Sequence, residues 1–467
     1  MRVEVQPSGS PQPSGAAGES PVTVRPSKQR WYMLLVCFLY SMTQSCVWNT
    51  FGPISTTSKE VFDWTDANIS LLSACGPIAF VLTGPVFSWI IEEKGLRVAY
   101  LISSTSTAIG TAFRCITFKK PTVTWLITIG HLLNGLGGPI ALCGPSAVSA
   151  LWFPSGERTT ALAIGIVGAY TGLGLAFIMG PNVIPELSNK SSEADNGEES
   201  SEVKKARDAI ANYMYFEAGW SALIFILIVF HFPSKPRHPP SASAGITREN
   251  YWDGVRKLSR NSQALLVVAV CSMTMGVVNG FASLLNVTLE KVDVSQTTAG
   301  WIGFYAIVSA CFMSLTVARY ADMFTHFVKE VAFSLIAVAL LAFLILKLAF
   351  MGVIPKSLPL FYATIIIGIS CINALNPILI NLACELAYPV GEGTTAFLVN
   401  LSTNVLILIV LLIMMIPNIG STWITWALVA ILAVSVPILM LVKVTFNRLA
   451  VDLLHTVTST VSENSKE

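Results

Sequence analysis

The chain alternates between long apolar runs and short polar segments. An α-helix needs roughly 20 apolar residues to cross a hydrocarbon core about 30 Å thick. Runs of that length predict six spans in the first part of the chain, at 31–54, 69–91, 97–117, 122–143, 159–184 and 213–232. Six more follow, at 264–287, 300–320, 329–351, 358–383, 394–416 and 422–445. The pattern predicts an all-α membrane protein with twelve transmembrane helices in two six-helix halves.

The polar segments divide the chain. Residues 1–30 are rich in Pro, Ser and Gly and lack the apolar core of a signal peptide, so we expect a disordered cytosolic tail. The segment around 233–262 has four prolines and six Lys or Arg, a composition typical of a linker. We therefore expect an N-terminal half over 31–232, a cytosolic linker over 233–262, a C-terminal half over 263–445 and a cytosolic tail over 446–467.

Composition excludes several classes of protein. The chain is 53% hydrophobic and only 12% charged, whereas charged residues make up about a quarter of a soluble domain. The net charge of +2 gives no basic surface for nucleic acid. The nine cysteines show no CxxC or Cys/His spacing, so we expect no metal site and no cofactor. No HExxH or comparable catalytic set occurs, which argues against an intramembrane enzyme.

The distribution of basic residues predicts the orientation. If the N-terminus is cytosolic, 18 of the 29 Lys and Arg fall on the cytosolic side, as the positive-inside rule requires. Glycosylation sequons then lie on the outer side at Asn189, Asn68 and Asn286. We predict that Asn189, in the long polar loop at 185–212, carries a glycan.

Two inner turns carry related charges. Glu92, Gly95 and Arg97 follow the second span, and Asp322 follows the eighth. Both turns resemble the G-x-x-x-D-R-x-G-R loop of the major facilitator superfamily, in which the acid latches the cytosolic face. The match is partial, because Ser88 replaces the first glycine and Glu93 the arginine. Ordinary solvated turn charges are the alternative.

Several longer stretches resemble solute carrier family 49. They are residues 44–53 (Gln-Ser-Cys-Val-Trp-Asn-Thr-Phe-Gly-Pro), Lys94 to Arg97, Arg114-Cys115, Leu133-Asn134-Gly135, Trp152-Phe153, Glu157-Arg158, residues 300–304 (Gly-Trp-Ile-Gly-Phe), Ala318-Arg319 with Asp322, and Glu385 with Tyr388-Pro389-Val390 and Glu392-Gly393. The resemblance implies a major facilitator fold and a small organic substrate. One branch of the family is regarded as a lysosomal, proton-dependent carrier of vitamin B6 (pyridoxine), and others are implicated in choline and haem transport.

The resemblance also suggests substrate contacts. Trp48 matches the tryptophan that packs on the choline headgroup in relatives, where an aromatic face attracts a cation. The alternative is an aromatic residue at the outer interface. The glutamine that contacts choline in relatives aligns with Gly138, which argues against choline.

Polar residues inside spans are functional candidates, because burying them in lipid is costly. Gln44 and Asn49 flank Trp48 on the first span, His131 and Asn134 lie three apart on the fourth, and Asn373 lies on the tenth, three residues before Asn376. We predict that they bind a hydroxylated ring. Helix-to-helix hydrogen bonding is the alternative.

Ion coupling has few candidates. Glu217 opens the sixth span and could pair with Arg114 at the same side of the third. The resemblance ranks Glu217 above His131, where relatives have glutamine, although His has a suitable reference pKa of about 6.5. Glu385, at the inner edge, is assigned to the gate with Glu92, Arg97 and Asp322.

The combined expectation is a secondary transporter in a lipid bilayer, coupled to protons and moving pyridoxine from lysosome to cytosol. The alternatives are a facilitative carrier of choline-like amines or haem at the plasma membrane, and a sensor built on a transporter fold. The oligomeric state stays open, with a monomer expected.

Overall fold

The computed structural model describes residues 27–185, 201–241, 251–283, 285–290, 292, 294, 296–414 and 422–451. Within these ranges the secondary structure is helical. The sequon at Asn189 and the first 26 residues lie outside the described residues.

The first half contains six long helices and one short one. They are α1 (Gln29–Trp48), α2 (Ser55–Phe62), α3 (Asp66–Trp89), α4 (Leu96–Phe113), α5 (Thr122–Trp152), α6 (Arg158–Val183) and α7 (Ser201–Phe230), with a π-helical turn at Ile90–Lys94 and a 3-10 turn at Ser155–Glu157. The linker ends in α9 (Tyr251–Arg260).

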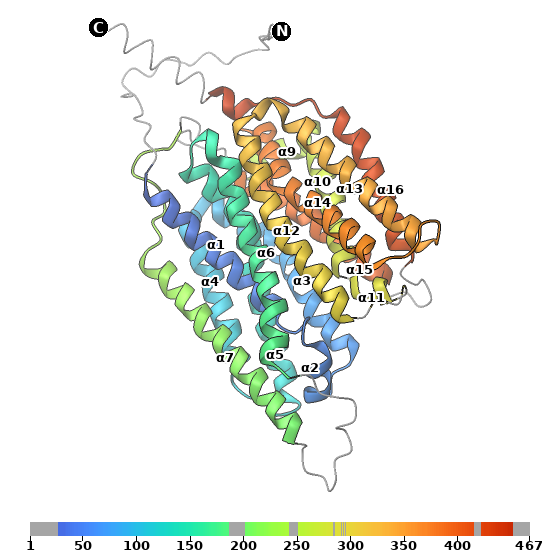
Figure 1. Cartoon of the computed structure of the whole chain (residues 1–467). Coiled ribbons are helices and arrows are strands. Elements are labelled where there is room, and N and C mark those ends of the chain that lie inside the picture. Colours follow the sequence, from blue (N-terminus) through green and yellow to red (C-terminus); the bar gives the residue numbers. More distant parts are fainter. Residues whose placement is uncertain are drawn as a thin grey trace, which may run out of the picture.

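The second half repeats the pattern. Its helices are α10 (Ser262–Ser283), α11 (Leu285–Glu290), α12 (Gln296–Met323), α13 (Val328–Phe350), α14 (Leu358–Ala387), α15 (Glu392–Met414) and α16 (Thr422–Leu441), with a 3-10 turn at Thr325–Phe327. Figure 1 shows the two halves side by side, blue to green and yellow to red.

Ten of these helices are long and apolar enough to cross a membrane by length and composition. The other two long helices are α1 and α4, with 20 and 18 residues. In α4, a run of Ser and Thr lowers the hydropathy. The hydroxyls of Thr105 and Thr111 donate to carbonyls of the preceding turn, which satisfies these two polar groups within the helix. With these two, the described residues contain the twelve long helices that the sequence predicts.

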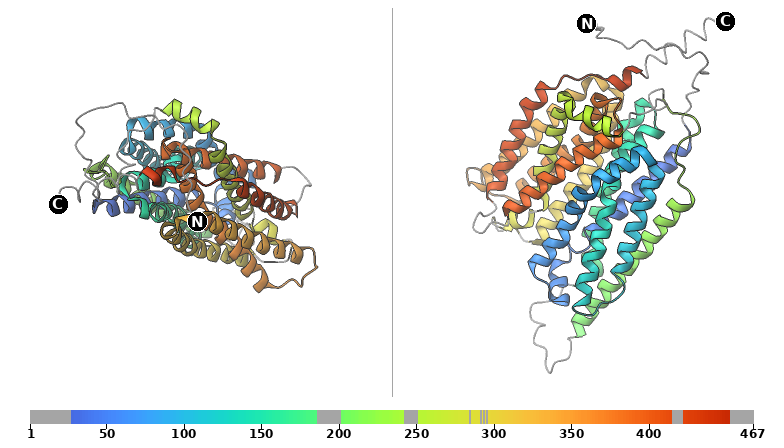
Figure 2. Two further views of the ribbon diagram at one scale, coloured as in Figure 1. Left: turned by 90° about the horizontal axis from the view of Figure 1, so that it is seen from above. Right: turned by 180° about the vertical axis from the view of Figure 1, so that it is seen from behind.

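Within each half, the first long helix packs on several later ones. Helix α1 packs on α5 and α6, and α10 packs on α14, α15 and α16. The halves meet along two seams, where α3 and α5 face α15, and where α6 faces α12. Figure 2 shows the same division from above and behind.

Small residues bring α1 and α6 into backbone contact. A Cβ added at Gly172 would lie 2.0 Å from the Met42 carbonyl oxygen, and one added at Gly168 would lie 2.6 Å from that of Phe38. No side chain fits at either position. Dispersion contacts that small residues permit are a main source of helix association inside a membrane, so these glycines fix α1 against α6.

The helix ends differ from the predicted spans. Helix α5 continues past residue 143 to Trp152, and α7 begins at Ser201, before the predicted start at 213. Helix α1 ends at Trp48, and residues 49–54 form an irregular turn where the sequence predicts a continuing span. The hydropathy pattern marks the apolar part of a helix, whereas the hydrogen-bonded helix continues into polar surroundings or stops early.

Candidate functional site: a buried ion pair and an inner latch

A buried ion pair joins two helices of the first half. Arg114, at the C-terminus of α4, donates from Nη2 to Oε2 of Glu217 on α7 over 2.8 Å. Thr50, just beyond α1, donates to Glu217 Oε1 over 2.8 Å and accepts from Arg114 Nη2 over 3.0 Å. Arg114 is 1% exposed and Glu217 is 4% exposed. Charges this deep persist only when they are paired and hydrogen-bonded. These three side chains bond to one another, and Nε of Arg114 is left without a partner among the described residues.

His131 lies near this group. The centre of the Phe51 ring is 5.4 Å from the Arg114 guanidinium carbon and 5.5 Å from the centre of the His131 ring. Nδ1 of His131 is 3.3 Å from the Ile127 carbonyl oxygen. His131 is therefore enclosed within the first half, close to the ion pair rather than beside the second half.

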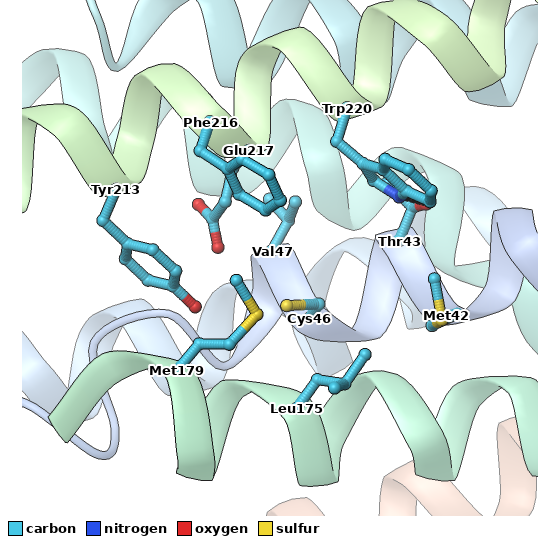
Figure 3. A pocket seen from close by; sticks show the side chains of 10 residues that line it. All are labelled: Met42, Thr43, Cys46, Val47, Leu175, Met179, Tyr213, Phe216, Glu217 and Trp220. Carbon is cyan, nitrogen blue, oxygen red and sulfur yellow. Dashed lines mark hydrogen bonds between the residues drawn. The ribbon is translucent and has the colours of Figure 1, made fainter. Parts of the chain in front are cut away.

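A cavity of about 190 Å³ reaches Glu217 from another side. It lies between α1, α6 and α7, and its walls are mostly apolar (Figure 3). The residues that line it are Met42, Thr43, Cys46, Val47, Leu175, Met179, Tyr213, Phe216, Glu217 and Trp220. The Trp220 indole donates to the Thr43 hydroxyl over 2.9 Å. Glu217 therefore lines this cavity, although its solvent exposure is small.

Gln44 and Asn134 lock α1 to α5. Gln44 Nε2 donates to the Asn134 carbonyl over 3.4 Å, and Asn134 Nδ2 donates to the Gln44 carbonyl over 3.2 Å. Both side chains therefore hold helices together in this conformation. The Oδ1 atom of Asn134 is buried and has no partner among the described residues.

Trp48 and Asn49 end the same helix with unused donors. The indole Nε1 of Trp48 and the Nδ2 of Asn49 are buried and make no hydrogen bond within the described part of the chain. The Trp48 ring rests on Gly76 of α3, where an added Cβ would lie 2.4 Å from Nε1. Buried polar atoms without partners are rare in native proteins, and such a group can mark the place of a ligand or water.

Asn373 stands apart from the other candidates. Its Nδ2 donates to the Ile369 carbonyl of its own helix, α14, over 2.9 Å. Its neighbour Asn376 reaches across to the first half, where it donates to the Tyr170 hydroxyl over 3.4 Å. The structure thus groups the predicted substrate residues of the first half around α1 and α5, and leaves Asn373 in the second half.

Two carboxylates latch one end of the bundle, which the sequence predicts to be cytosolic and which we call the inner end. Glu92 Oε1 accepts from the Thr394 amide over 3.2 Å, at the start of α15. Asp322 accepts from the amides of Thr159 and Thr160 over 2.9 and 2.6 Å, at the start of α6. Each acid thus caps a helix N-terminus of the opposite half, where unpaired amides and the helix dipole favour negative charge. The inner end is closed.

Glu385 belongs to a third cluster at the inner end. Arg448, beyond α16, binds Glu385 Oε1 over 2.8 Å, Glu392 Oε1 over 3.3 Å and Asn381 Oδ1 over 2.7 Å. Burial acts to lower the pKa of Arg448, but the two carboxylates outweigh it and raise the pKa above its ordinary value. Asn381 in turn donates to Thr159 of the first half over 3.0 Å, so the cluster touches the latch.

Arg97 has a different contact from the one the motif predicts. It donates to the Val229 carbonyl at the end of α7 over 3.3 Å. Sequence reasoning missed Thr50, Arg448 and Tyr170. A threonine near the end of a predicted span, an arginine in a tail and a tyrosine inside a span have no local pattern that marks them. No group of three or more His, Cys, Asp or Glu that could hold a metal occurs among the described residues.

Comparisons with known proteins identify the family. Residues 33–406 match the model of the Major Facilitator Superfamily. The chain is 34% identical over 390 residues to the solute carrier family 49 member 4 homolog of Xenopus tropicalis, covering 81% of this chain and 84% of the relative. It is 25% identical over 418 residues to the choline/ethanolamine transporter flvcr2a of Danio rerio, covering 86% and 82%.

Solved structures share the fold. The chain is similar to FucP, a major facilitator transporter in the outward conformation, with a TM-score of 0.67 and 13% identity over 89% of this chain and 99% of that one. It is similar to the proton:xylose symporter XylE bound to 6-bromo-6-deoxy-D-glucose, with a TM-score of 0.69 and 14% identity over 91% and 99%. These proteins are transporters rather than enzymes. The chain is a multi-pass membrane protein that belongs to the major facilitator superfamily and, within it, to solute carrier family 49.

Proposed function

We propose that this secondary transporter carries pyridoxine from the lysosomal lumen to the cytosol, and that Glu217 carries the coupled proton. The main support for this proposal is the buried group of Glu217, Arg114 and Thr50. An ionisable side chain inside a membrane span costs free energy, so it is found mainly where it has a function. A static ion pair that braces α4 against α7 is the competing explanation. The lysosome as the compartment rests on the family resemblance.

Coupling requires that the proton affinity of Glu217 differ between conformations. Burial disfavours its charged form, whereas Arg114 and Thr50 favour it. All three residues belong to the first half, so rocking of the halves as rigid bodies leaves their contacts intact. The movable contact is that of Thr50, which lies in the irregular turn at 49–54 after α1.

The same turn begins beside the substrate candidates. Trp48 and Asn49 lie one or two residues before Thr50, and their donors are unused. A substrate ring that stacks on Trp48 and bonds to Asn49 would pull on the turn and so on the Thr50 hydroxyl. We infer that this short connection links substrate binding to protonation: with Thr50 withdrawn, the Glu217 carboxylate loses a hydrogen bond and takes up a proton more easily.

Uptake into proteoliposomes tests this proposal. We expect wild type to accumulate labelled pyridoxine when the lumenal face is acidic and to equilibrate it without a gradient. Glu217→Gln should equilibrate but not accumulate. Glu330→Gln, which changes an exposed acid at the start of α13, is the matched control and should behave as wild type. Accumulation by Glu217→Gln would remove Glu217 from the mechanism, and a wild type indifferent to the gradient would remove proton coupling.

Choline is the competing substrate, because Trp48 offers an aromatic face to a cation and relatives are named choline/ethanolamine transporters. Against it, Gly138 stands where those relatives have glutamine. A competition panel with unlabelled pyridoxine, choline and ethanolamine separates the two: pyridoxine should compete and choline should not. Binding without any uptake would instead identify a sensor.

A further inference from the structure

Helix α9 at the end of the linker has two unlike faces. Tyr251, Gly254 and Leu258 are buried, at the spacing of one helical stripe. The other face is exposed and includes Trp252, Arg256 and Arg260. Trp252 is 74% exposed, an unusual position for a tryptophan on a surface that faces only water.

The buried face bridges the two halves at the inner end. The Tyr251 amide donates to Glu93 Oε1 over 3.3 Å, and its hydroxyl donates to the Pro85 carbonyl over 3.3 Å, both in the first half. Leu258 belongs to a hydrophobic cluster made mainly of second-half residues, and α9 packs on α10 and α15. Glu93 is adjacent in sequence to Glu92 of the latch, so α9 connects the two halves beside the latch.

The chain geometry holds α9 at the level of the bilayer surface. Only Asn261 separates it from α10, which enters the membrane. The Asn261 side chain accepts from the Ala264 amide over 3.1 Å and donates to the Leu386 carbonyl over 2.8 Å, which fixes this junction. Seen from above, α9 (yellow-green) lies at the rim of the bundle rather than over its centre (Figure 2, left).

The exposed face has the chemistry of a membrane-surface contact. Arg256, Lys257 and Arg260 outnumber Asp253 on it, and all four are exposed. Tryptophan favours the headgroup region, and each Lys or Arg near an anionic leaflet strengthens attachment by about fivefold. We infer that α9 binds anionic phospholipid headgroups of the inner leaflet through Trp252, Arg256 and Arg260.

Such binding acts on the latch through one contact. The Trp252 ring packs edge-on against Tyr251, with ring centres 5.1 Å apart, so the lipid-facing residue supports the residue that bonds to Glu93. Anionic lipid therefore keeps α9 ordered and favours the closed inner end. This role is independent of the substrate and of Glu217.

Hydrogen exchange in nanodiscs tests the inference on the full chain. We expect the peptide that covers α9 to exchange more slowly in phosphatidylcholine mixed with phosphatidylserine than in phosphatidylcholine alone. The double change Arg256→Gln with Arg260→Gln should reduce this slowing by about 10-fold to 30-fold. Lys235→Gln with Arg237→Gln, which removes the same charge from an exposed part of the same linker, should leave it nearly unchanged.

Three outcomes would overturn the inference. They are equal exchange in the two lipid mixtures, equal loss of the slowing in both double variants, and the same slowing when inorganic phosphate replaces phosphatidylserine. Thermal melting of each variant in detergent checks that the fold is intact. Hydrogen exchange in α14, a largely buried helix, is the internal reference for each sample.

Discussion

Replacing Gly76 by alanine should weaken substrate binding, because the added methyl group would displace the indole ring of Trp48. The added Cβ would lie 2.4 Å from Trp48 Nε1 and 2.8 Å from Cδ1, which is about 1 Å inside the usual contact distance of roughly 3.5 Å. The α3 backbone is held by its own helical hydrogen bonds, so the indole has to move.

The expected size follows from what the ring contributes. An aromatic contact to a ring or cation is worth about 0.5 to 2 kcal/mol, so displacing Trp48 should raise the apparent KM roughly 2-fold to 30-fold. The assay is initial-rate uptake of labelled pyridoxine over a range of concentrations, with protein abundance measured in parallel.

A matched control separates this effect from helix propensity. An added Cβ at Gly219 of α7 meets nothing within 4 Å, so Gly219→Ala should gain about 0.5 to 1 kcal/mol of helix stability and keep KM. In the Gly76→Ala background, Trp48→Phe should lose little further affinity, because the ring is already displaced. An unchanged KM in Gly76→Ala, or fully additive losses in the double variant, would refute the placement of Trp48 in the substrate path.

Three further changes probe the rest of the site. Thr50→Val removes one hydrogen bond to Glu217 and should lower the ratio of gradient-driven to gradient-free uptake; an unchanged ratio would contradict the role of the turn at 49–54. Asp322→Asn removes a charge that stabilises the start of α6 by about 0.5 to 2 kcal/mol. It should raise the rate at which a thiol reagent on the cytosolic side labels Cys384, which is buried at the inner end, by about 2-fold to 30-fold. Asp253→Asn, on the exposed face of α9, should leave that rate unchanged. Arg448→Gln leaves two carboxylates without their cation and should lower the free energy of unfolding by about 3 to 5 kcal/mol. Arg448→Lys keeps the charge and should lower the free energy of unfolding by less. Arg319→Gln, which changes an exposed arginine on α12, is the control and should melt as wild type does.

The sequence predicts the twelve long helices because bilayer thickness sets the length of every span, and hydropathy reports that length directly. It does not predict α2 or α9, since neither is long enough to cross a membrane and the pattern search looks for long apolar runs. The halves and the linker follow from the same reasoning, because the polar segment at 233–262 interrupts the runs.

The candidate site is a harder case. Glu217 and Arg114 stand out because charges are rare in spans, and the structure brings them together at 2.8 Å. Thr50 supports them, yet it lies in a turn where the hydropathy predicts helix, so nothing in the sequence links it to residues 64 and 167 positions away. Because Gln44 and Asn134 are polar residues inside spans, the sequence predicts that they bind substrate. In this conformation their side chains hydrogen-bond α1 to α5 instead. Polarity inside a span identifies residues that need partners, but only the packing decides whether the partner is a helix or a substrate.

Substrate-driven proton movement tests proton coupling through Glu217. Proteoliposomes that contain a pH-sensitive dye, with equal pH on both sides, receive pyridoxine outside. We expect wild type to acidify the lumen of the vesicles as pyridoxine enters, and Glu217→Gln to exchange labelled pyridoxine without moving protons. Pyridoxine entry with no pH change in wild type, or an undiminished pH change in Glu217→Gln, would contradict it.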